Sequence, residues 1–159
     1  MLPVARREAR ERALSLLYEA ESKGVSPEAV IAELPVKPDA FATGLVMGVG
    51  VEQARIDSLI SSHAIGWAMD RMPVVDRALL RMGTYELLEH EDVPTAVIIS
   101  EAVDLATQYS TDESGRFVNG VLAAIATDVR GESAPAPDPR EPVERVERVD
   151  PLEPPGPLG

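Results

Sequence analysis

Apolar residues recur every three or four positions along most of the first 130 residues, which is the spacing of one face of an α-helix. Residues that end or cap helices separate these stretches. The predicted helices are one that ends at Gly24, a short one from Ser26 to Leu34, a long one from Asp39 to Ile60, one opened by Pro73, one opened by Pro94, and a last one that begins near Asp112.

The long third helix contains an ambiguous stretch. Gly44, Gly48 and Gly50 each weaken a helix by up to about 1 kcal/mol. The apolar run from Leu45 to Val51 could therefore form a buried strand instead. We favour the helix because the apolar stripe keeps its helical phase, and we attribute the glycines to the close approach of another helix.

The remaining patterns indicate an all-α fold. The pair Asn119-Gly120, a common hairpin turn, lies inside a helical pattern. Repeats of solenoid length and long heptad runs are absent from the sequence. We therefore predict a compact bundle of six to seven helices, with an aliphatic core because aromatic residues make up only 4% of the chain.

The composition changes abruptly after residue 130. Residues 131–159 contain 8 of the 14 prolines, and 7 acidic residues against 3 arginines. Because such a segment cannot bury a core, we interpret 1–130 as a folded helical domain and 131–159 as a disordered, proline-rich acidic tail. The formal net charge of the chain is -12, which disfavours non-specific binding to nucleic acid.

Groups suited to catalysis or metal binding are scarce. The chain has no cysteine, and neither His63 nor His90 has a second histidine at metal-ligand spacing, so capping or surface roles fit them better. The Gly44–Gly50 run lacks the Gly-Lys-Ser/Thr ending of a phosphate loop, and Glu101 and Asp104 fit a solvated helix face. We expect a protein that is not an enzyme, with no catalytic residue, metal or cofactor.

No apolar run approaches the roughly 20 residues that span a bilayer, and the first 20 residues lack the apolar block of a signal peptide. We therefore expect a soluble, cytoplasmic protein without a membrane partner.

Arg6, Arg7 and Arg10 form the most informative cluster. Their spacing of three and four places them in one patch near the start of the first helix. Arginine at a helix start opposes the macrodipole, so helix stability does not explain the patch. The guanidinium groups could bind phosphates of single-stranded RNA, with Tyr18 as a stacking or polar contact. The alternative is an exposed helix start whose arginines pair with neighbouring glutamates.

Four blocks of sequence resemble the NusB family of bacterial proteins in both order and spacing. They are ARREARE leading to LY (residues 5–18), VDRALLR with YELL (75–88), DVP followed by EAVDLA (92–106), and SGRFVNGVL (114–122). The resemblance covers about residues 4–130. It implies a fold of two small helical subdomains and a role in transcription antitermination without catalysis.

Family resemblance also implies the partners. NusB-like proteins bind the boxA element of nascent RNA, mainly ribosomal RNA leaders, together with NusE, a small-subunit ribosomal protein, in the transcription elongation complex. Some relatives associate with themselves, so a homodimer is possible here.

By position, the resemblance implies two sets of functional residues. The RNA-binding set is Arg6, Arg7, Arg10, Tyr18, Glu113, Arg116 and Phe117. The set that faces NusE is Tyr18, Asp76, Arg77 and Arg81. Phe117 also fits the apolar stripe of the last helix, and Asp76 also fits a favourable helix-start acid, so a core role and a capping role stay open for these two.

Several features predict weak intrinsic affinity for RNA. Glu8 stands where many relatives have a basic residue, and Glu113 stands where aspartate is expected. Three arginines on a single strand give a slope of only about -2 for log affinity against log salt. We therefore expect RNA binding chiefly as a heterodimer with NusE. The acidic tail could compete with RNA for the arginines, but we favour its interpretation as a solvating appendage.

Two other classes remain as alternatives. One is a helical adaptor that binds only protein. The other is the NusB-like RNA-binding module of certain ribosomal RNA cytosine methyltransferases, although the proline-rich tail shows no pattern for binding a methyl donor.

Overall fold

Helices make up nearly all of the chain that the structure describes. This computed structural model describes the backbone of residues 3–131 and the side chains of residues 6–131. The α-helices are α1 (Pro3–Lys23), α2 (Pro27–Glu33), α3 (Ala40–Val51), α4 (Gln53–His63), α5 (Val74–Glu89), α6 (Thr95–Tyr109) and α7 (Asp112–Arg130), and a 3-10 turn, η1, spans Met69–Arg71. No strand occurs within residues 3–131, which confirms the predicted all-α class. The predicted acidic tail lies outside the described residues from 132 onward.

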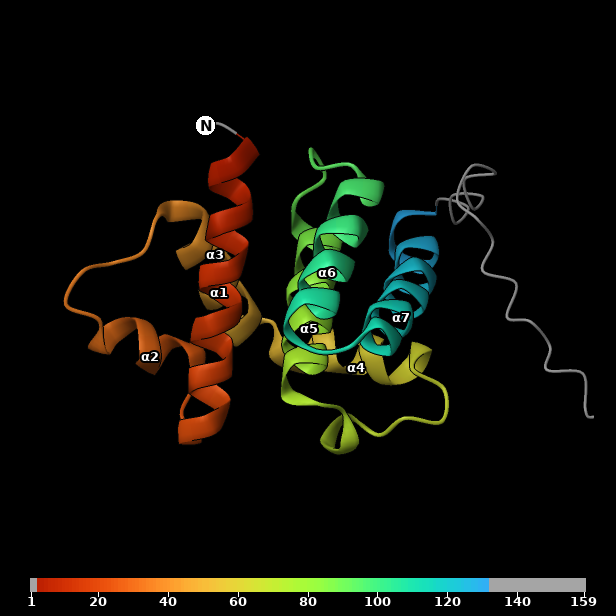
Figure 1. Cartoon of the computed structure of the whole chain (residues 1–159), viewed down its shortest axis with the longest axis horizontal. Coiled ribbons are helices and arrows are strands. Elements are labelled where there is room, and N and C mark those ends of the chain that lie inside the picture. The colour runs from red at the N-terminus through yellow and green to blue at the C-terminus, as the bar shows by residue number, and fades with distance from the viewer. Residues whose placement is uncertain (1–2, 132–159) are drawn as a thin grey trace, which may run out of the picture.

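Two groups of helices lie side by side (Figure 1). Helices α1, α2 and α3 form one group, and α5, α6 and α7 form the other, with α4 along their base. Helix α5 is central, because it packs against α1, α3, α4, α6 and α7. This arrangement matches the two helical subdomains that the family resemblance implies.

Side-chain caps begin three of the helices where the sequence predicts. In each case a side-chain oxygen accepts a hydrogen bond from the backbone N–H three residues later. The pairs are Ser26 with Ala29 at 3.2 Å, Asp39 with Ala42 at 2.7 Å, and Thr111 with Ser114 at 3.0 Å. The start of α7, which carries several predicted site residues, is therefore fixed locally.

The predicted long helix from Asp39 to Ile60 is wrong in one respect. It breaks at Glu52, whose φ and ψ of -97° and 12° lie outside the α-helical region, so that α3 and α4 are separate helices. Helix α3 packs on α1 and α2, whereas α4 packs on α5 and α7, and a change of direction allows both contacts. The strand alternative for Leu45–Val51 is also wrong, because this segment lies within α3.

Close packing accounts for two of the three glycines in α3. A Cβ at Gly48 would overlap the Tyr85 ring of α5, and a Cβ at Gly50 would overlap the Glu28 side chain of α2. The expected close approach of another helix is therefore confirmed at these two positions, whereas Gly44 has open space around it.

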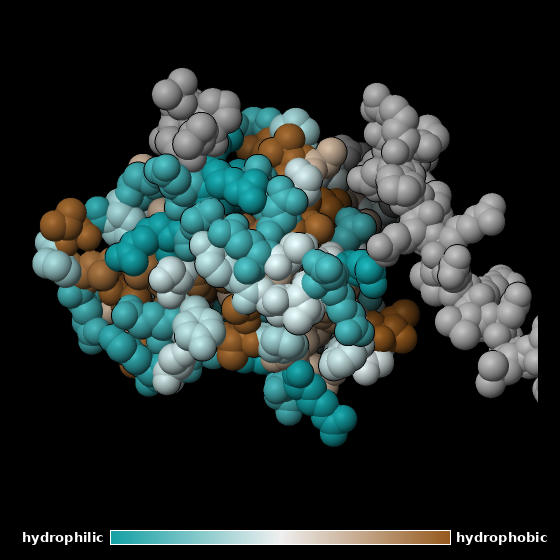
Figure 2. All heavy atoms as spheres, viewed as in Figure 1, coloured by the Kyte–Doolittle hydropathy of each residue, from teal (hydrophilic) through white to brown (hydrophobic). Residues whose placement is uncertain are grey.

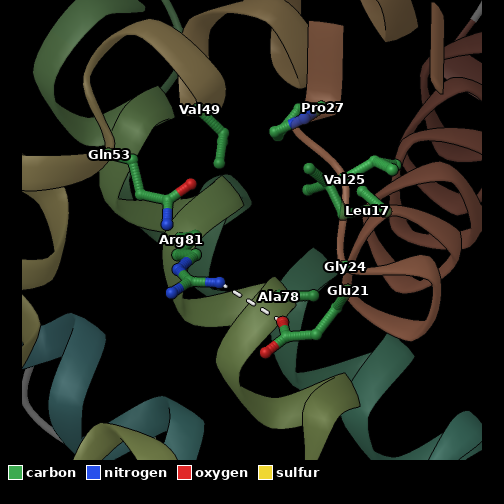
Figure 3. A pocket seen from close by; sticks show the side chains of 10 residues that line it. Leu17, Glu21, Gly24, Val25, Pro27, Val49, Gln53, Ala78 and Arg81 are labelled. Carbon is green, nitrogen blue, oxygen red and sulfur yellow. Dashed lines mark hydrogen bonds and ion pairs between the residues drawn. The ribbon is translucent and has the colours of Figure 1, made fainter. Parts of the chain in front are cut away.

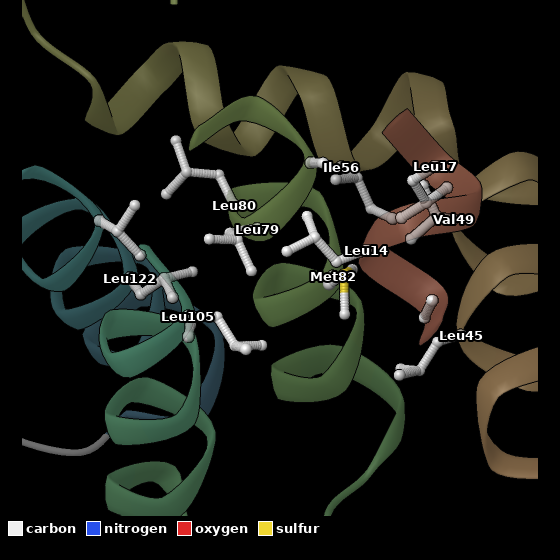
Figure 4. Packing of buried hydrophobic residues seen from close by; sticks show 14 of the residues in the cluster. Leu14, Leu17, Leu45, Val49, Ile56, Leu79, Leu80, Met82, Leu105 and Leu122 are labelled. Atoms are coloured by element: carbon white, nitrogen blue, oxygen red, sulfur yellow. The ribbon is translucent and has the colours of Figure 1, made fainter. Parts of the chain in front are cut away.

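A continuous aliphatic core joins the two groups of helices (Figure 4). Leu79 and Leu80 of α5 lie between Leu45 of α3 and Leu122 of α7. All of the largest fully buried side chains are aliphatic, as the low aromatic content predicts.

The surface is mainly polar, with small separate apolar areas on the face shown in Figure 2. Among the described residues, no helix combines the length and the apolar character needed to cross a membrane.

Replacing Gly83 by alanine should destabilise the fold. A Cβ at Gly83 would lie 2.7 Å from a methyl carbon of Leu122, which is fully buried in the core. We expect an overpacking cost of about 1–3 kcal/mol in the free energy of unfolding, measured by urea denaturation. The control is Gly120→Ala, at a glycine with nothing within 4 Å, which should stabilise α7 by up to about 1 kcal/mol. Equal effects would contradict the packing argument.

Candidate nucleic-acid interface

Two of the predicted RNA-binding arginines are accessible at the start of α1. Arg7 faces α6, where its Nη1 lies 3.2 Å from Asp104 Oδ2 and 3.5 Å from Glu101 Oε2, and 34% of its side chain is exposed. Arg6 places its Cζ 5.0 Å from the centroid of the Phe41 ring in α3. Glu101 and Asp104 thus do more than form the solvated face expected of them, because both contact Arg7.

Arg10, the third arginine of the predicted patch, is buried with a relative exposure of 4%. Its Nε and Nη2 donate hydrogen bonds to the two carboxylate oxygens of Glu86 in α5, at 3.1 and 2.8 Å. Glu86 is itself only 2% exposed. The expected patch of three arginines on one surface is therefore wrong at Arg10, and the accessible patch consists of Arg6 and Arg7.

Opposing effects act on the pKa of Glu86. Burial raises that pKa, but the interactions with His90 and Arg10 lower it and prevail, so the pKa of Glu86 lies below the ordinary glutamate value. His90 is the C-cap residue of α5, and its Nδ1 lies 3.6 Å from Glu86 Oε1. The capping role predicted for His90 is thus confirmed, and Glu86 remains ionised opposite Arg10.

A cavity of about 290 Å³ opens beside the start of α7. The rings of Trp67 and Phe117 line it, with centroids 5.8 Å apart and planes inclined by 55°. Phe117 is half-buried, packing against the core while its ring reaches this cavity. Phe117 therefore belongs both to the core and to the accessible surface. Glu113 and Arg116 are exposed, and Glu113 also lines the cavity.

Asp76 brings a buried carboxylate to the same cavity. Its relative exposure is 3%, and Oδ1 has no hydrogen-bond partner among the described residues. The residue lies in the first turn of α5, where a negative charge is stabilised by the helix dipole. A buried carboxylate oxygen without a partner, beside two aromatic rings, suits a hydrogen-bond donor or a cation supplied by a binding partner.

Tyr18 lines a second, more open cavity of about 460 Å³ between α1, α5 and α6. Tyr18 is 48% exposed. Across the cavity, Tyr109 donates a hydrogen bond of 3.3 Å to Glu11. Two accessible tyrosines thus border a groove, and Ser110, which follows Tyr109 in the chain, lines the cavity beside α7.

Arg77 and Arg81 lie away from these cavities, in a cluster with acidic residues. Arg81 donates to both carboxylate oxygens of Asp57, at 2.8 and 3.0 Å, and Arg77 pairs with Glu21 and donates to the Met69 carbonyl at 2.7 Å. Figure 3 shows the Glu21–Arg81 pair beside a third cavity, of about 250 Å³. These guanidiniums join α1, α4 and α5, and the structure does not bring them together with Tyr18 and Asp76.

The predicted RNA-binding residues fall at two ends of the bundle. The accessible arginines lie at the start of α1, and the predicted residues of α7 lie in its first two turns, at the opposite end of the view in Figure 1. The groove at Tyr18 lies between them. A single strand that contacts every accessible member of the set would have to run along α1 and α6.

Sequence reasoning missed three participants in these sites: Phe41, Glu86 and Trp67. Phe41 and Glu86 contact α1 from distant parts of the chain, and no local pattern signals such contacts. Trp67 had a local signal, since it is an aromatic residue directly after a loop glycine. In the part of the chain that the structure describes, no group of three or more His, Asp or Glu side chains is arranged to bind a metal ion.

The fold and its surface features define an all-helical bundle protein with accessible arginines, cavities bordered by aromatic rings, and a buried carboxylate oxygen without a partner. Comparison with known proteins specifies the family. The NusB family model matches residues 7–127, and the chain therefore belongs to the NusB family.

Sequence relatives share about half of their aligned residues with this chain. A Transcription antitermination protein NusB from Kineococcus radiotolerans is 50% identical over 126 residues, covering 77% of this chain and 93% of the relative. The protein of the same name from Salinispora tropica is 51% identical over 130 residues, covering 77% and 95%.

Solved structures of the family have the same fold. T. maritima NusB superposes with a TM-score of 0.69 at 35% identity, covering 82% of this chain and 93% of its own. A chain from a crystal structure of antitermination factors NusB and NusE in complex with dsRNA gives a TM-score of 0.67 at 30% identity, covering 80% and 99%.

The Arg10–Glu86 pair should stabilise the protein at neutral pH and lose its contribution in acid. Because the pKa of Glu86 is lower in the folded state than in an unfolded chain, its contribution is complete above the unfolded-state pKa. The contribution falls as the pH decreases through the folded-state pKa. Urea unfolding at a series of acidic pH values measures this loss.

The matched variant is Arg10→Met with Glu86→Leu, which removes both charges and retains apolar volume. It should unfold with a weaker pH dependence than the wild type, whereas Glu86→Leu alone leaves Arg10 buried and unpaired and should cost about 3–5 kcal/mol. An equal loss of stability in acid for the wild type and the double variant would contradict the assignment.

Proposed function

We propose that this protein is a transcription antitermination factor that binds boxA-type single-stranded RNA of nascent ribosomal transcripts together with NusE, as part of a cytoplasmic transcription elongation complex. The family match over residues 7–127 carries the proposal. The structural neighbour in complex with NusE and dsRNA supports an RNA partner and a NusE partner for this chain. The boxA element rests on the family resemblance of the sequence.

RNA phosphates would bind at Arg6 and Arg7. The N–H donors of a guanidinium lie in its plane and match the oxygens of a phosphate. RNA has to displace or share the acidic partners of Arg7, Glu101 and Asp104, which lowers the net gain from each phosphate contact. The electrostatic contribution to affinity is therefore small, in accord with the negative charge of the whole chain.

Bases would bind near Phe117 at the other end of the bundle. Trp67 is 52% exposed and lies beside the half-buried Phe117, and accessible aromatic rings provide stacking surfaces for unpaired bases. Glu113 and Arg116 border this region and can accept from or donate to base edges. One strand would then contact phosphate-binding and base-stacking sites at opposite ends of the protein.

NusE would bind at the groove that contains Tyr18 and at the carboxylate of Asp76. A basic side chain of the partner would compensate the buried charge of Asp76. Arg77 and Arg81 would support this surface indirectly, because their guanidiniums are engaged with Glu21 and Asp57. Arg6 and Arg7 would thus bind RNA phosphates, whereas RNA bases and a basic side chain of NusE would meet at the cavity that Trp67, Phe117 and Asp76 line.

A protein-only adaptor is the second candidate, favoured by the buried Asp76 carboxylate, whose Oδ1 has no hydrogen-bond partner among the described residues. It requires that the two accessible arginines contribute nothing to RNA binding. One set of RNA titrations, with and without NusE, distinguishes the two functions.

Fluorescence anisotropy with a boxA RNA and a scrambled control, each with and without the cognate NusE, tests the proposal. We expect preferential binding of boxA that is much tighter with NusE and that falls at least tenfold in Arg6→Ala/Arg7→Ala. The control Arg55→Ala removes an exposed arginine of α4 and should leave affinity unchanged. Equal or absent binding of both RNAs in all conditions, with NusE still bound, would establish the adaptor instead.

A further inference from the structure

The Phe41 ring contacts two of the N-terminal arginines. The Cζ atoms of Arg6 and Arg10 lie 5.0 and 5.2 Å from its centroid, within the range of cation–π attraction. The ring is also 5.5 Å from the His90 ring and packs partly against the core. Because Phe41 lies in the first turn of α3, behind the side-chain cap of Asp39, its backbone is fixed as well.

The two arginines differ in what else restrains them. Arg10 is buried and forms two hydrogen bonds to Glu86. Arg6 is half-buried and has no ion pair with a carboxylate of any described residue. Contact with the Phe41 ring is therefore the interaction that the structure gives for the guanidinium of Arg6.

We propose that Phe41 is a positioning residue for RNA binding, which orders the Arg6 guanidinium against its ring so that the in-plane N–H groups are free to bind a phosphate. This inference rests on the proposed function at Arg6. Cation–π contact uses the face of the guanidinium and leaves its donors available. A restrained arginine also loses less side-chain entropy when it binds.

Contacts around Phe41 disfavour a direct role in stacking on a base. The ring is partly buried and already contacts two guanidiniums and an imidazole. A contact chain instead runs from the buried Glu86 through Arg10 and Phe41 to Arg6. The interior of the bundle thereby determines the direction of an accessible arginine.

The first test uses the free protein and needs no RNA. NMR relaxation of the arginine Nε–Hε groups should show Arg6 to be more ordered than the exposed Arg12 of the same helix. Phe41→Leu should remove this difference and Phe41→Tyr should retain it. Equal mobility of Arg6 and Arg12 in the wild type would overturn the inference, whatever the protein binds.

The second test is a double-mutant cycle on boxA RNA affinity in the presence of NusE. Phe41→Leu should weaken binding about two- to fivefold, the range of an exposed cation–π contact, and Phe41→Tyr should restore wild-type affinity. In an Arg6→Ala background, Phe41→Leu should have no further effect. The control Met47→Leu alters another partly buried core contact of α3 and should leave affinity unchanged.

Outcomes separate this inference from the proposed function. If Arg6→Ala weakens RNA binding but Phe41→Leu does not, or acts equally in both backgrounds, the positioning role is wrong and the proposed function stands. If Arg6→Ala has no effect on RNA binding, the phosphate contact proposed at Arg6 and the positioning role of Phe41 are both wrong, whereas loss of boxA preference in the wild type would overturn the proposed function itself. Loss of affinity in Phe41→Leu that Phe41→Tyr fails to restore also contradicts the positioning role.

Discussion

The buried ion pair between Arg10 and Glu86 is the contact on which the proposed interface depends. It joins α1 to the central helix α5 across 76 residues of sequence, at the edge of the aliphatic core. Two buried charges are costly to desolvate, and they are tolerated here because the guanidinium and the carboxylate form two hydrogen bonds with each other. By fixing one face of α1, the pair directs Arg6 and Arg7 toward the accessible surface.

Arginines in this protein divide between structural and surface roles. Arg130 donates to backbone carbonyls at the end of α5 and in the following loop, and Arg77 and Arg81 join three helices through acidic partners. The chain has a net charge of -12. Because several of its arginines are engaged in contacts within the fold, the positively charged surface that remains is small. The proposed RNA binding would therefore have a modest dependence on salt.

The helical fold was predictable because its signals are local. Apolar spacing and the capping residues Ser26, Asp39 and Thr111 identify the helices and their order. The break at Glu52 was not predictable, because it depends on which helices α3 and α4 contact. The environment of Arg10 was hidden for the same reason, since spacing places it beside Arg6 and Arg7 and gives no indication of Glu86. The cavity beside α7 was partly predictable, since Asp76 and Phe117 lie in the blocks that resemble the family and Glu113 directly precedes the last block, whereas Trp67 reaches the cavity through a loop.

Salt dependence of RNA binding tests most directly whether Arg10 is structural while Arg6 and Arg7 bind phosphate. Slopes of log affinity against log salt are measured with boxA RNA and NusE for the wild type and for Arg10→Met/Glu86→Leu. The account predicts equal slopes, because the apolar replacements keep α1 packed on α5, Phe41 still contacts Arg6, and Arg10 contacts no phosphate. It predicts a slope shallower by about 1.4 in Arg6→Ala/Arg7→Ala. A slope shallower by about 0.7 in the Arg10→Met/Glu86→Leu variant would show that Arg10 neutralises a phosphate, and would contradict the account.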